Sequence, residues 1–229
     1  MPRLIQAKEV DSTNEWIKRN LGKLENLDSF IAETQSSGKG RNSKNWFSPK
    51  GGLWFSILLE NFEHEAGTLS MLCATAACEA LEEHGLSTNI KWPNDIILKG
   101  RKLGGILIEK VNGKFIIGLG LNLNLNNSDF PIPLKDIVIT SKEILRKELD
   151  IEAIAKGIIK IIAKDRDNIE EVHKKYLKLS GDLNEKVKIE NGEEIFIGKV
   201  VEIQADGGIK IKNEETEKVF YSGSLSYLA

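Results

Sequence analysis

A run of strand-like segments between residues 89 and 125 restricts the fold more than any other feature of the sequence. The segments NIKWPNDIIL, GILIEKV and KFIIGLGLNLNL are apolar or alternating, and the short turns KGRKLG and Asn112–Gly113 join them. Two-residue Asn-Gly turns connect antiparallel strands. The sequence therefore predicts an antiparallel meander over these residues.

Helical patterns occupy three other stretches. Ser12 and Glu15 have the spacing of a capping box at the start of a first predicted helix, which ends before Gly22. Residues 66–84 are rich in Ala, Leu and Met, which predicts a buried helix with a glycine after its last turn. Isoleucines recur at helical steps within residues 141–179. Strands and helices mix without strict βαβ alternation, so the predicted class is α+β, with helices covering the sheet.

The last stretch of the chain, from about Asn184, changes character. Short β runs are separated by turns such as Asn191–Gly192 and Asn213–Glu214. This pattern predicts a small barrel. We expect one domain over residues 1–182 and a second over residues 183–229.

Composition excludes several classes of protein. With 41% hydrophobic and 29% charged residues and a formal net charge of −2, the 229 residues fit a globular chain without a general attraction for nucleic acid or membranes. The start MPRLIQAKEV resembles no signal peptide, and no apolar run is long enough for a membrane span, so we expect a cytoplasmic protein. Helical spacing turns Cys73 and Cys78 apart, which argues against a disulfide, and the three scattered histidines indicate no zinc site.

A polar loop carries candidate ligand-binding cations. The run Gly38–Arg41 (GKGR) is followed by Lys44 and Trp46. Glycines let the backbone approach a ligand, and the cations can form charge-assisted bonds to carboxylate or phosphate. The spacing is not that of a P-loop, so a solvated basic surface loop fits the pattern as well.

A second candidate lies where KWPND, residues 91–95, interrupts an apolar strand. Proline in a strand indicates an edge or a bulge, where side chains can turn toward a ligand, although a plain strand-end turn is the alternative. Lys102 stands seven residues after Asp95 and precedes Gly104 and Gly105. The paired glycines would let this lysine point into a cleft, whereas an exposed turn lysine is the simpler interpretation of the segment alone.

In order and spacing, these motifs resemble those of biotin–protein ligases over nearly the whole chain. The matching motifs are DSTN from Asp11, the GKGR loop, WFSP from Trp46, KWPND, RKLGGILIE and GLGLN ending at Asn122. KWPND followed by RKLGGIL is highly specific, whereas DSTN alone is consistent with a helix cap. The resemblance implies a catalytic domain with a mixed β-sheet backed by helices, related to lipoate ligases and class II aminoacyl-tRNA synthetases, and a small C-terminal SH3-like barrel.

The resemblance also implies a reaction in two halves. The carboxylate of biotin attacks the α-phosphorus of ATP to give biotinoyl-5′-adenylate and pyrophosphate, and a lysine of a biotin carboxyl carrier protein or domain then attacks the acyl carbon. Because two anions meet in the first half, cationic side chains and a magnesium ion bound with ATP are expected. No dedicated metal cluster is indicated, and Asp95 is a candidate partner for the metal or for Lys102.

Roles carry over residue by residue from the matching motifs. Lys102 and Arg41 are the expected catalytic cations. The expected biotin-binding residues are Ser12, Thr13, Asn14, Gln35, Gly38, Lys39, Gly40, Arg41, Lys102 and Gly104. The expected nucleotide-binding residues are Arg41, Lys44, Trp46, Asn94, Asp95, Lys102 and Asn122. Lys39, Gly40 and Arg41 match a loop that orders over biotin and the adenylate.

The loop departs from the common family pattern GRGR-x-GR-x-W. Lys39 replaces the first arginine and keeps its charge, but it lacks the bidentate fork, so we expect weaker retention of the adenylate. The end of the chain lacks an arginine that some members carry, which leaves a role of the tail in ATP binding open.

Three rival functions are weighed against this one. DSTN and KWPND favour biotin over the lipoate of the sister ligases. A biotin-sensing repressor would need a DNA-binding domain before Asp11, so no DNA partner is expected. An inactive binding module would not need Lys102 and Arg41, and the presence of both favours catalysis.

We also expect a homodimer formed through an exposed sheet edge, for which residues 113–125 are the candidate.

Overall fold

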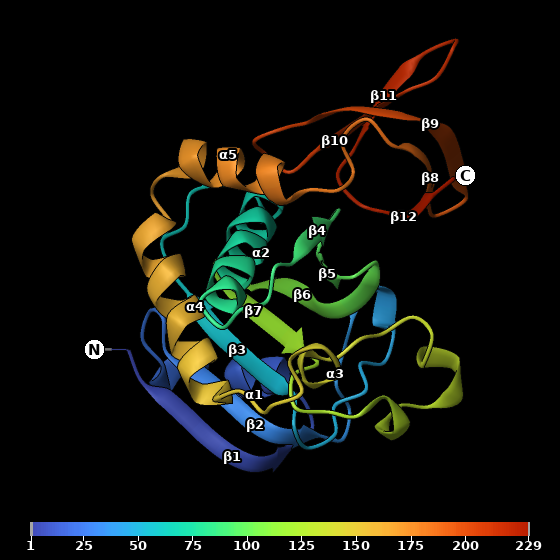
Figure 1. The fold of residues 1–229 in the computed structure, drawn as a ribbon. Coiled ribbons are helices and arrows are strands. Elements are labelled where there is room, and N and C mark those ends of the chain that lie inside the picture. Colours follow the sequence, from blue (N-terminus) through green and yellow to red (C-terminus); the bar gives the residue numbers. More distant parts are fainter. Residues whose placement is uncertain (1, 229) are drawn as a thin grey trace.

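The computed structural model describes residues 2–228 and contains two β-sheets with helices packed on the larger one (Figure 1). The first sheet has seven strands in the order β1-β2-β3-β7-β6-β5-β4, and the second has five in the order β11-β10-β9-β8-β12. β1 runs parallel to β2, and the other pairings between strands are antiparallel. The predicted α+β class with a mixed, helix-backed sheet is therefore confirmed.

The elements have the following bounds. The first sheet comprises β1 (Leu4–Val10), β2 (Ser29–Gln35), β3 (Leu53–Leu59), β4 (Asn89–Lys91), β5 (Asp95–Leu98), β6 (Arg101–Val111) and β7 (Lys114–Leu121). The helices are α1 (Thr13–Asn20), α2 (Ala66–Glu82), α3 (Ser141–Leu145), α4 (Ile151–Asp165) and α5 (Ile169–Leu179). The second sheet comprises β8 (Lys186–Asn191), β9 (Glu194–Ile203), β10 (Ile209–Lys212), β11 (Glu217–Phe220) and β12 (Ser224–Tyr227). Short 3₁₀ turns cover Leu21–Lys23, Arg41–Ser43, Asn127–Asp129 and Ile132–Leu134.

The predicted meander is confirmed, with two corrections. KWPND does not bend one strand but makes the turn of a β4–β5 hairpin, and Lys102 lies within β6 rather than in the turn before it. The predicted sheet edge at residues 113–125 is wrong, because β7 pairs with β3 on one side and with β6 on the other. Burial on both faces explains the nearly continuous apolar character of this central strand.

The helices follow the sequence pattern, apart from one cap. α2 ends just before Gly85, which has the positive φ of +86° that favours glycine. The capping box predicted at Ser12 is wrong, since its side chain makes no capping hydrogen bond. Glu15 instead pairs with Lys18 and Lys39, at 2.9 and 2.7 Å. The segment 141–179, predicted to be helical, forms the three helices α3, α4 and α5.

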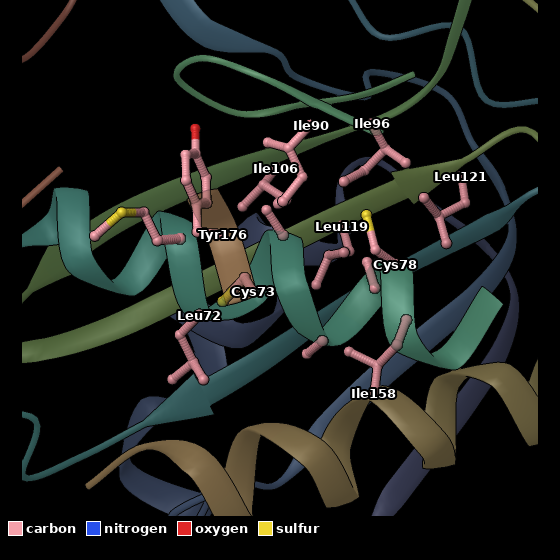
Figure 2. Packing of buried hydrophobic residues seen from close by; sticks show 14 of the residues in the cluster. Leu72, Cys73, Cys78, Ile90, Ile96, Ile106, Leu119, Leu121, Ile158 and Tyr176 are labelled. Carbon is pink, nitrogen blue, oxygen red and sulfur yellow. The ribbon is translucent and has the colours of Figure 1, made fainter. Parts of the chain in front are cut away.

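The main core lies between the first sheet and α2, and α4 and α5 pack against α2 and also contact β3 and β4, respectively. Figure 2 shows α2 between the strands that carry Leu119 and Leu121 and the helix that carries Ile158. Both cysteines are buried there and free, and burial raises the pKa of Cys78 to about 12, so these thiols act as small apolar residues. α1 covers the opposite face of the sheet with a smaller apolar cluster.

The second sheet starts at Lys186 and packs against α2 through the turn between β9 and β10. Gly67 approaches that turn so closely that a Cβ on it would lie 2.3 Å from the Asp206 carbonyl oxygen. Thr68 Oγ1 donates to the Ala205 carbonyl at 3.1 Å. The predicted β-rich tail is therefore present as five antiparallel strands, consistent with an SH3-like domain. No helix within residues 2–228 is long and apolar enough to cross a membrane.

The packing of α4 against α2 gives a first prediction. Ile158 is fully buried, so Ile158→Ala removes apolar contacts and should lower the free energy of unfolding by about 2–5 kcal/mol. Ile132, which is 82% exposed, provides the matched control, and Ile132→Ala should change that value by less than about 0.5 kcal/mol. Urea unfolding of both variants measures the difference, and equal losses would contradict the described core.

Candidate functional site

A cavity of about 350 Å³ opens at the N-terminal end of α1. Its walls come from the loop after β2, the β4–β5 turn, β6, β7, the segment 130–138 and the start of β12. Of the residues predicted for the site, those that line the cavity are Ser12, Thr13, Asn14, Gln35, Lys39, Gly40, Arg41, Lys44, Trp46, Asn94, Asp95, Lys102 and Asn122. The fold therefore gathers into one place residues that are more than a hundred positions apart in sequence.

Gly38 and Gly104 are predicted site residues that lie behind the wall of the cavity. A Cβ on Gly38 would sit 2.5 Å from the Trp46 carbonyl oxygen, and one on Gly104 would sit 2.3 Å from Leu121 Cδ2. Both positions need a small residue so that neighbouring backbone can pack closely. The two glycines therefore support the residues that line the cavity.

One end of the cavity presents uncharged polar groups from the start of α1. The Thr13 N–H and Oγ1 both donate to Gln35 Oε1, at 2.8 and 3.1 Å. Gln35 Nε2 donates to Ser48 Oγ at 2.8 Å. These bonds fix the orientation of the Gln35 amide, and the buried Ser12 lines the same cavity.

Asn14 is held at the same end by two further side chains. Its Nδ2 donates to Glu109 Oε2 at 2.8 Å, and its Oδ1 lies 2.5 Å from Ser56 Oγ. Lys18 Nζ lies 2.7 Å from Glu109 Oε1 and balances the charge of that carboxylate. The sequence prediction missed Glu109 and Ser56, because strand alternation gives no sign that they reach Asn14 across the sheet.

Three strand glycines form the bottom of the cavity, and we call Gly105, Gly118 and Gly120 the glycine floor. Gly105 pairs with Gly120 across β6 and β7. A Cβ on Gly118 would lie 2.5 Å from Asn14 Oδ1, and one on Gly120 would lie 2.5 Å from Trp46 Nε1. Asn14 and Trp46 can therefore rest on the strands only because no side chain stands there.

The other end of the cavity is cationic. Lys102 Nζ lies 2.6 Å from Asp95 Oδ1 and 5.2 Å from the centroid of the Trp46 ring. Arg41 donates to Asn94 Oδ1 at 3.0 Å and to the Gly223 carbonyl at 3.3 Å. Burial lowers the pKa of the Arg41 guanidinium, and the nearby Asp95 carboxylate opposes that shift. Two cations thus face the space between the β4–β5 turn and β12.

Apolar residues of the segment 130–138, together with three residues at and just before the start of β12, complete the walls. They are Phe130, Leu134, Ile137, Val138, Gly223, Ser224 and Leu225. Sequence reasoning missed the first group, because it lies in a segment without periodicity, and it left a role of the second group, at the end of the chain, open. The apolar residues of the segment 130–138 stand inside an otherwise polar connection, and this contrast in the sequence could have indicated them.

The donor set bears on metal binding. Within residues 2–228, no group of three or more His, Cys, Asp or Glu side chains is placed to hold a metal ion. Asp95 supplies one carboxylate beside the two cations. One carboxylate suits a magnesium ion that is bound mainly by the phosphates of a substrate.

The fold and the cavity define an α+β protein with one site that joins an uncharged polar pocket to a cationic pocket across an aromatic ring. Residues 6–126 match the model of the biotin/lipoate A/B protein ligase family. That match covers more than half of the chain. The chain therefore belongs to the biotin/lipoate A/B protein ligase family.

Known relatives agree with this assignment. The chain is 32% identical over 212 residues to the bifunctional ligase/repressor BirA of Bacillus subtilis, covering 85% of this chain and 64% of the length of that relative. Among solved structures, the biotin protein ligase of Aquifex aeolicus in complex with biotin and ATP superposes with a TM-score of 0.89 at 33% identity, covering 100% of this chain and 99% of that one. The ligase of Leishmania major, at 20% identity and a TM-score of 0.70, shares the fold.

The indole of Trp46 gives a second prediction. Its Nε1 is buried and has no hydrogen-bond partner among residues 2–228, whereas Trp54 Nε1 donates to the Pro49 carbonyl at 2.8 Å. Trp46→Phe removes an unpaired donor, whereas Trp54→Phe leaves a buried carbonyl unpaired. The free energy of unfolding should therefore fall less in Trp46→Phe than in Trp54→Phe, by a difference of at least about 1 kcal/mol. Chemical denaturation of the two variants tests this, and a cost for Trp46→Phe equal to or above that for Trp54→Phe would contradict it.

Proposed function

We propose that the protein is an ATP-dependent biotin–protein ligase that forms biotinoyl-5′-adenylate and transfers biotin to a lysine of a biotin carboxyl carrier protein or domain. The observation that carries the proposal is the placement of Arg41 and Lys102 in the same cavity as the polar groups of Thr13, Asn14 and Gln35. The Aquifex aeolicus relative, described with biotin and ATP bound, supports it.

The polar pocket suits the ureido ring of biotin. That ring offers one carbonyl acceptor and two N–H donors, and Ser12, Thr13 and Asn14 supply hydroxyl and amide groups around one point. Gln35 and Glu109 keep the Thr13 and Asn14 side chains in place before the ligand arrives. Preorganised groups of this kind lose little entropy on binding.

The cationic pocket suits the first half-reaction. A carboxylate oxygen of biotin forms a bond to the α-phosphorus of ATP while the bond to the departing pyrophosphate breaks. Lys102 would hold the biotin carboxylate against the phosphate, and Arg41 would contact the phosphoryl oxygens, so their charges offset the repulsion between two anions. Asp95 keeps Lys102 oriented at 2.6 Å until the substrates bind.

A magnesium ion bound with ATP fits the single carboxylate of Asp95. When bound, it would neutralise charge on the phosphates. Lys44, Asn94 and Asn122 add polar groups at the same end of the cavity. The residues of this chain therefore supply orientation and most of the fixed positive charge.

The walls of the cavity are suited to hide a reactive adenylate from water. Trp46 and the apolar residues of the segment 130–138 would cover the adenine. Lys39, Gly40 and Arg41 lie on the loop that would close over the acyl phosphate, and Lys39 is paired with Glu15 in this structure. Water exclusion at this point preserves the intermediate for the acceptor lysine.

The second half-reaction needs a surface for the acceptor domain. β5 pairs with β6 up to Gly105, so within the described part of the chain the stretch of β6 beyond Ile106 has a strand neighbour on the β7 side alone. This open edge can accept a strand of the carrier domain or of a second copy, and we propose the latter for a homodimer.

We further propose a catalytic domain over residues 1–182, an SH3-like domain over residues 183–229, and a cytoplasmic location, where ATP and the acceptor carboxylase are supplied.

The adenylation step gives a third prediction. Wild-type protein mixed with magnesium-ATP and biotin should release pyrophosphate, and Lys102→Ala should reduce the rate by about a hundred-fold or more. Lys110 is on the same strand, lies over the Phe115 ring at 4.7 Å outside the cavity, and serves as the matched control. Lys110→Ala should release pyrophosphate at the wild-type rate.

The same measurement of pyrophosphate release with lipoate in place of biotin identifies which of the two acids in the family name is the substrate. Release with lipoate alone would move the assignment to a lipoate–protein ligase. No release with either acid would contradict the adenylation proposal and favour a binding module.

A further inference from the structure

Asp182, a residue without a role in the reaction described above, joins the two sheets from a fully buried position. Its Oδ2 accepts from the Trp92 backbone N–H at 2.7 Å and from Ser180 Oγ at 3.2 Å. Its Oδ1 accepts from the Tyr227 hydroxyl at 2.6 Å. One carboxylate therefore ties the β4–β5 turn of the first sheet to β12 of the second sheet.

The turn is held at a second point by the same residue, Trp92. The Trp92 indole N–H donates to the Gly207 carbonyl in the β9–β10 turn at 2.9 Å. Asn94 and Asp95 follow two and three residues later and contact Arg41 and Lys102. The position of these two polar side chains thus depends on how firmly Trp92 is anchored to the second sheet.

The strand at the other end of this link reaches the cavity directly. Gly223, Ser224 and Leu225 line the cationic end, and the Gly223 carbonyl accepts from Arg41. Tyr227 stands two residues beyond Leu225, and Lys91 Nζ lies 5.1 Å from the centroid of its ring. Asp182 therefore holds both walls between which Arg41 lies.

We propose that Asp182 and Tyr227 are positioning residues that set the affinity for ATP by fixing the β4–β5 turn and the start of β12 around Arg41. The polar pocket at Thr13 and Asn14 is built from α1, β2, β3 and β6, none of which carries Asp182 or its partners. Loss of the link should therefore weaken nucleotide binding and spare binding of the acid. This inference rests on the proposed function only for the identity of the two ligands.

Tyr227→Phe is the direct test, because it removes one hydroxyl from a half-exposed side chain and leaves the ring in place. Lys218→Met is the matched control, since its ammonium group also donates to a carboxylate in the second sheet, Glu194 Oε1 at 2.5 Å, and neither residue lines the cavity. Isothermal titration calorimetry with ATP and separately with biotin measures each affinity without turnover. We expect Tyr227→Phe to raise the Kd for ATP about five- to ten-fold, as for loss of one ordinary hydrogen bond, with the Kd for biotin within about two-fold.

The outcomes separate this inference from the proposed function. An unchanged ATP Kd in Tyr227→Phe, or equal weakening of ATP and biotin, would overturn the positioning role, as would the same loss in Lys218→Met. Asp182→Asn, checked by a thermal melt for folding, should weaken ATP binding at least as much as Tyr227→Phe does. A wild-type protein that binds ATP and biotin but releases no pyrophosphate would contradict the proposed reaction. The calorimetric comparison of the variants would still test the positioning role in that case.

Discussion

The glycine floor is the constraint on which the rest of the site depends. Side chains normally stand on both faces of a central strand, yet β6 and β7 present hydrogen atoms at Gly105, Gly118 and Gly120. The vacated space is occupied by Asn14 from one side and by Trp46 from the other. The polar pocket and the aromatic ring therefore owe their positions to the absence of three Cβ atoms, and the cavity lies where they meet.

The charges around the cavity are compensated to different degrees. Lys39 pairs with Glu15, and Lys102 pairs with Asp95, each at hydrogen-bonding distance. Arg41 instead rests on two neutral acceptors, the Asn94 amide oxygen and the Gly223 carbonyl, in a position where burial already lowers its pKa. A half-buried cation held by neutral groups gains most from an arriving anion, because a phosphate would replace weaker dipoles with a full opposite charge.

Local pattern was sufficient for most of the elements, and the motifs shared with biotin–protein ligases identified a part of the lining residues. The apolar runs, the Asn112–Gly113 turn and the β-rich tail predicted strands that the structure contains, and motif spacing predicted the residues that meet in the cavity. The errors arose where a long-range partner decides the outcome. Glu15 pairs with lysines rather than capping α1, and β7 is central because β3 returns beside it.

The residues that sequence reasoning missed or left open belong to contacts between distant segments. Glu109 reaches Asn14 from the far part of β6, and Gly223 to Leu225 enter from the second sheet. Neither contact leaves a periodic or compositional mark, because each is fixed by strand order and by the packing of the two sheets. Asp182 is similar, since a lone acidic residue after a helix gives no sign of the link it makes.

The most direct measurement of the central claim is the intact mass of a purified carrier domain after incubation with the protein, magnesium-ATP and biotin. The wild-type protein and the Gly22→Ala variant, where a Cβ meets no atom within 4 Å, should add one biotinoyl group to the acceptor lysine. Gly118→Ala places a Cβ 2.5 Å from Asn14 Oδ1 and should label the domain at least about ten-fold more slowly. No labelling by the wild-type protein, or labelling by Gly118→Ala at the wild-type rate, would contradict the account.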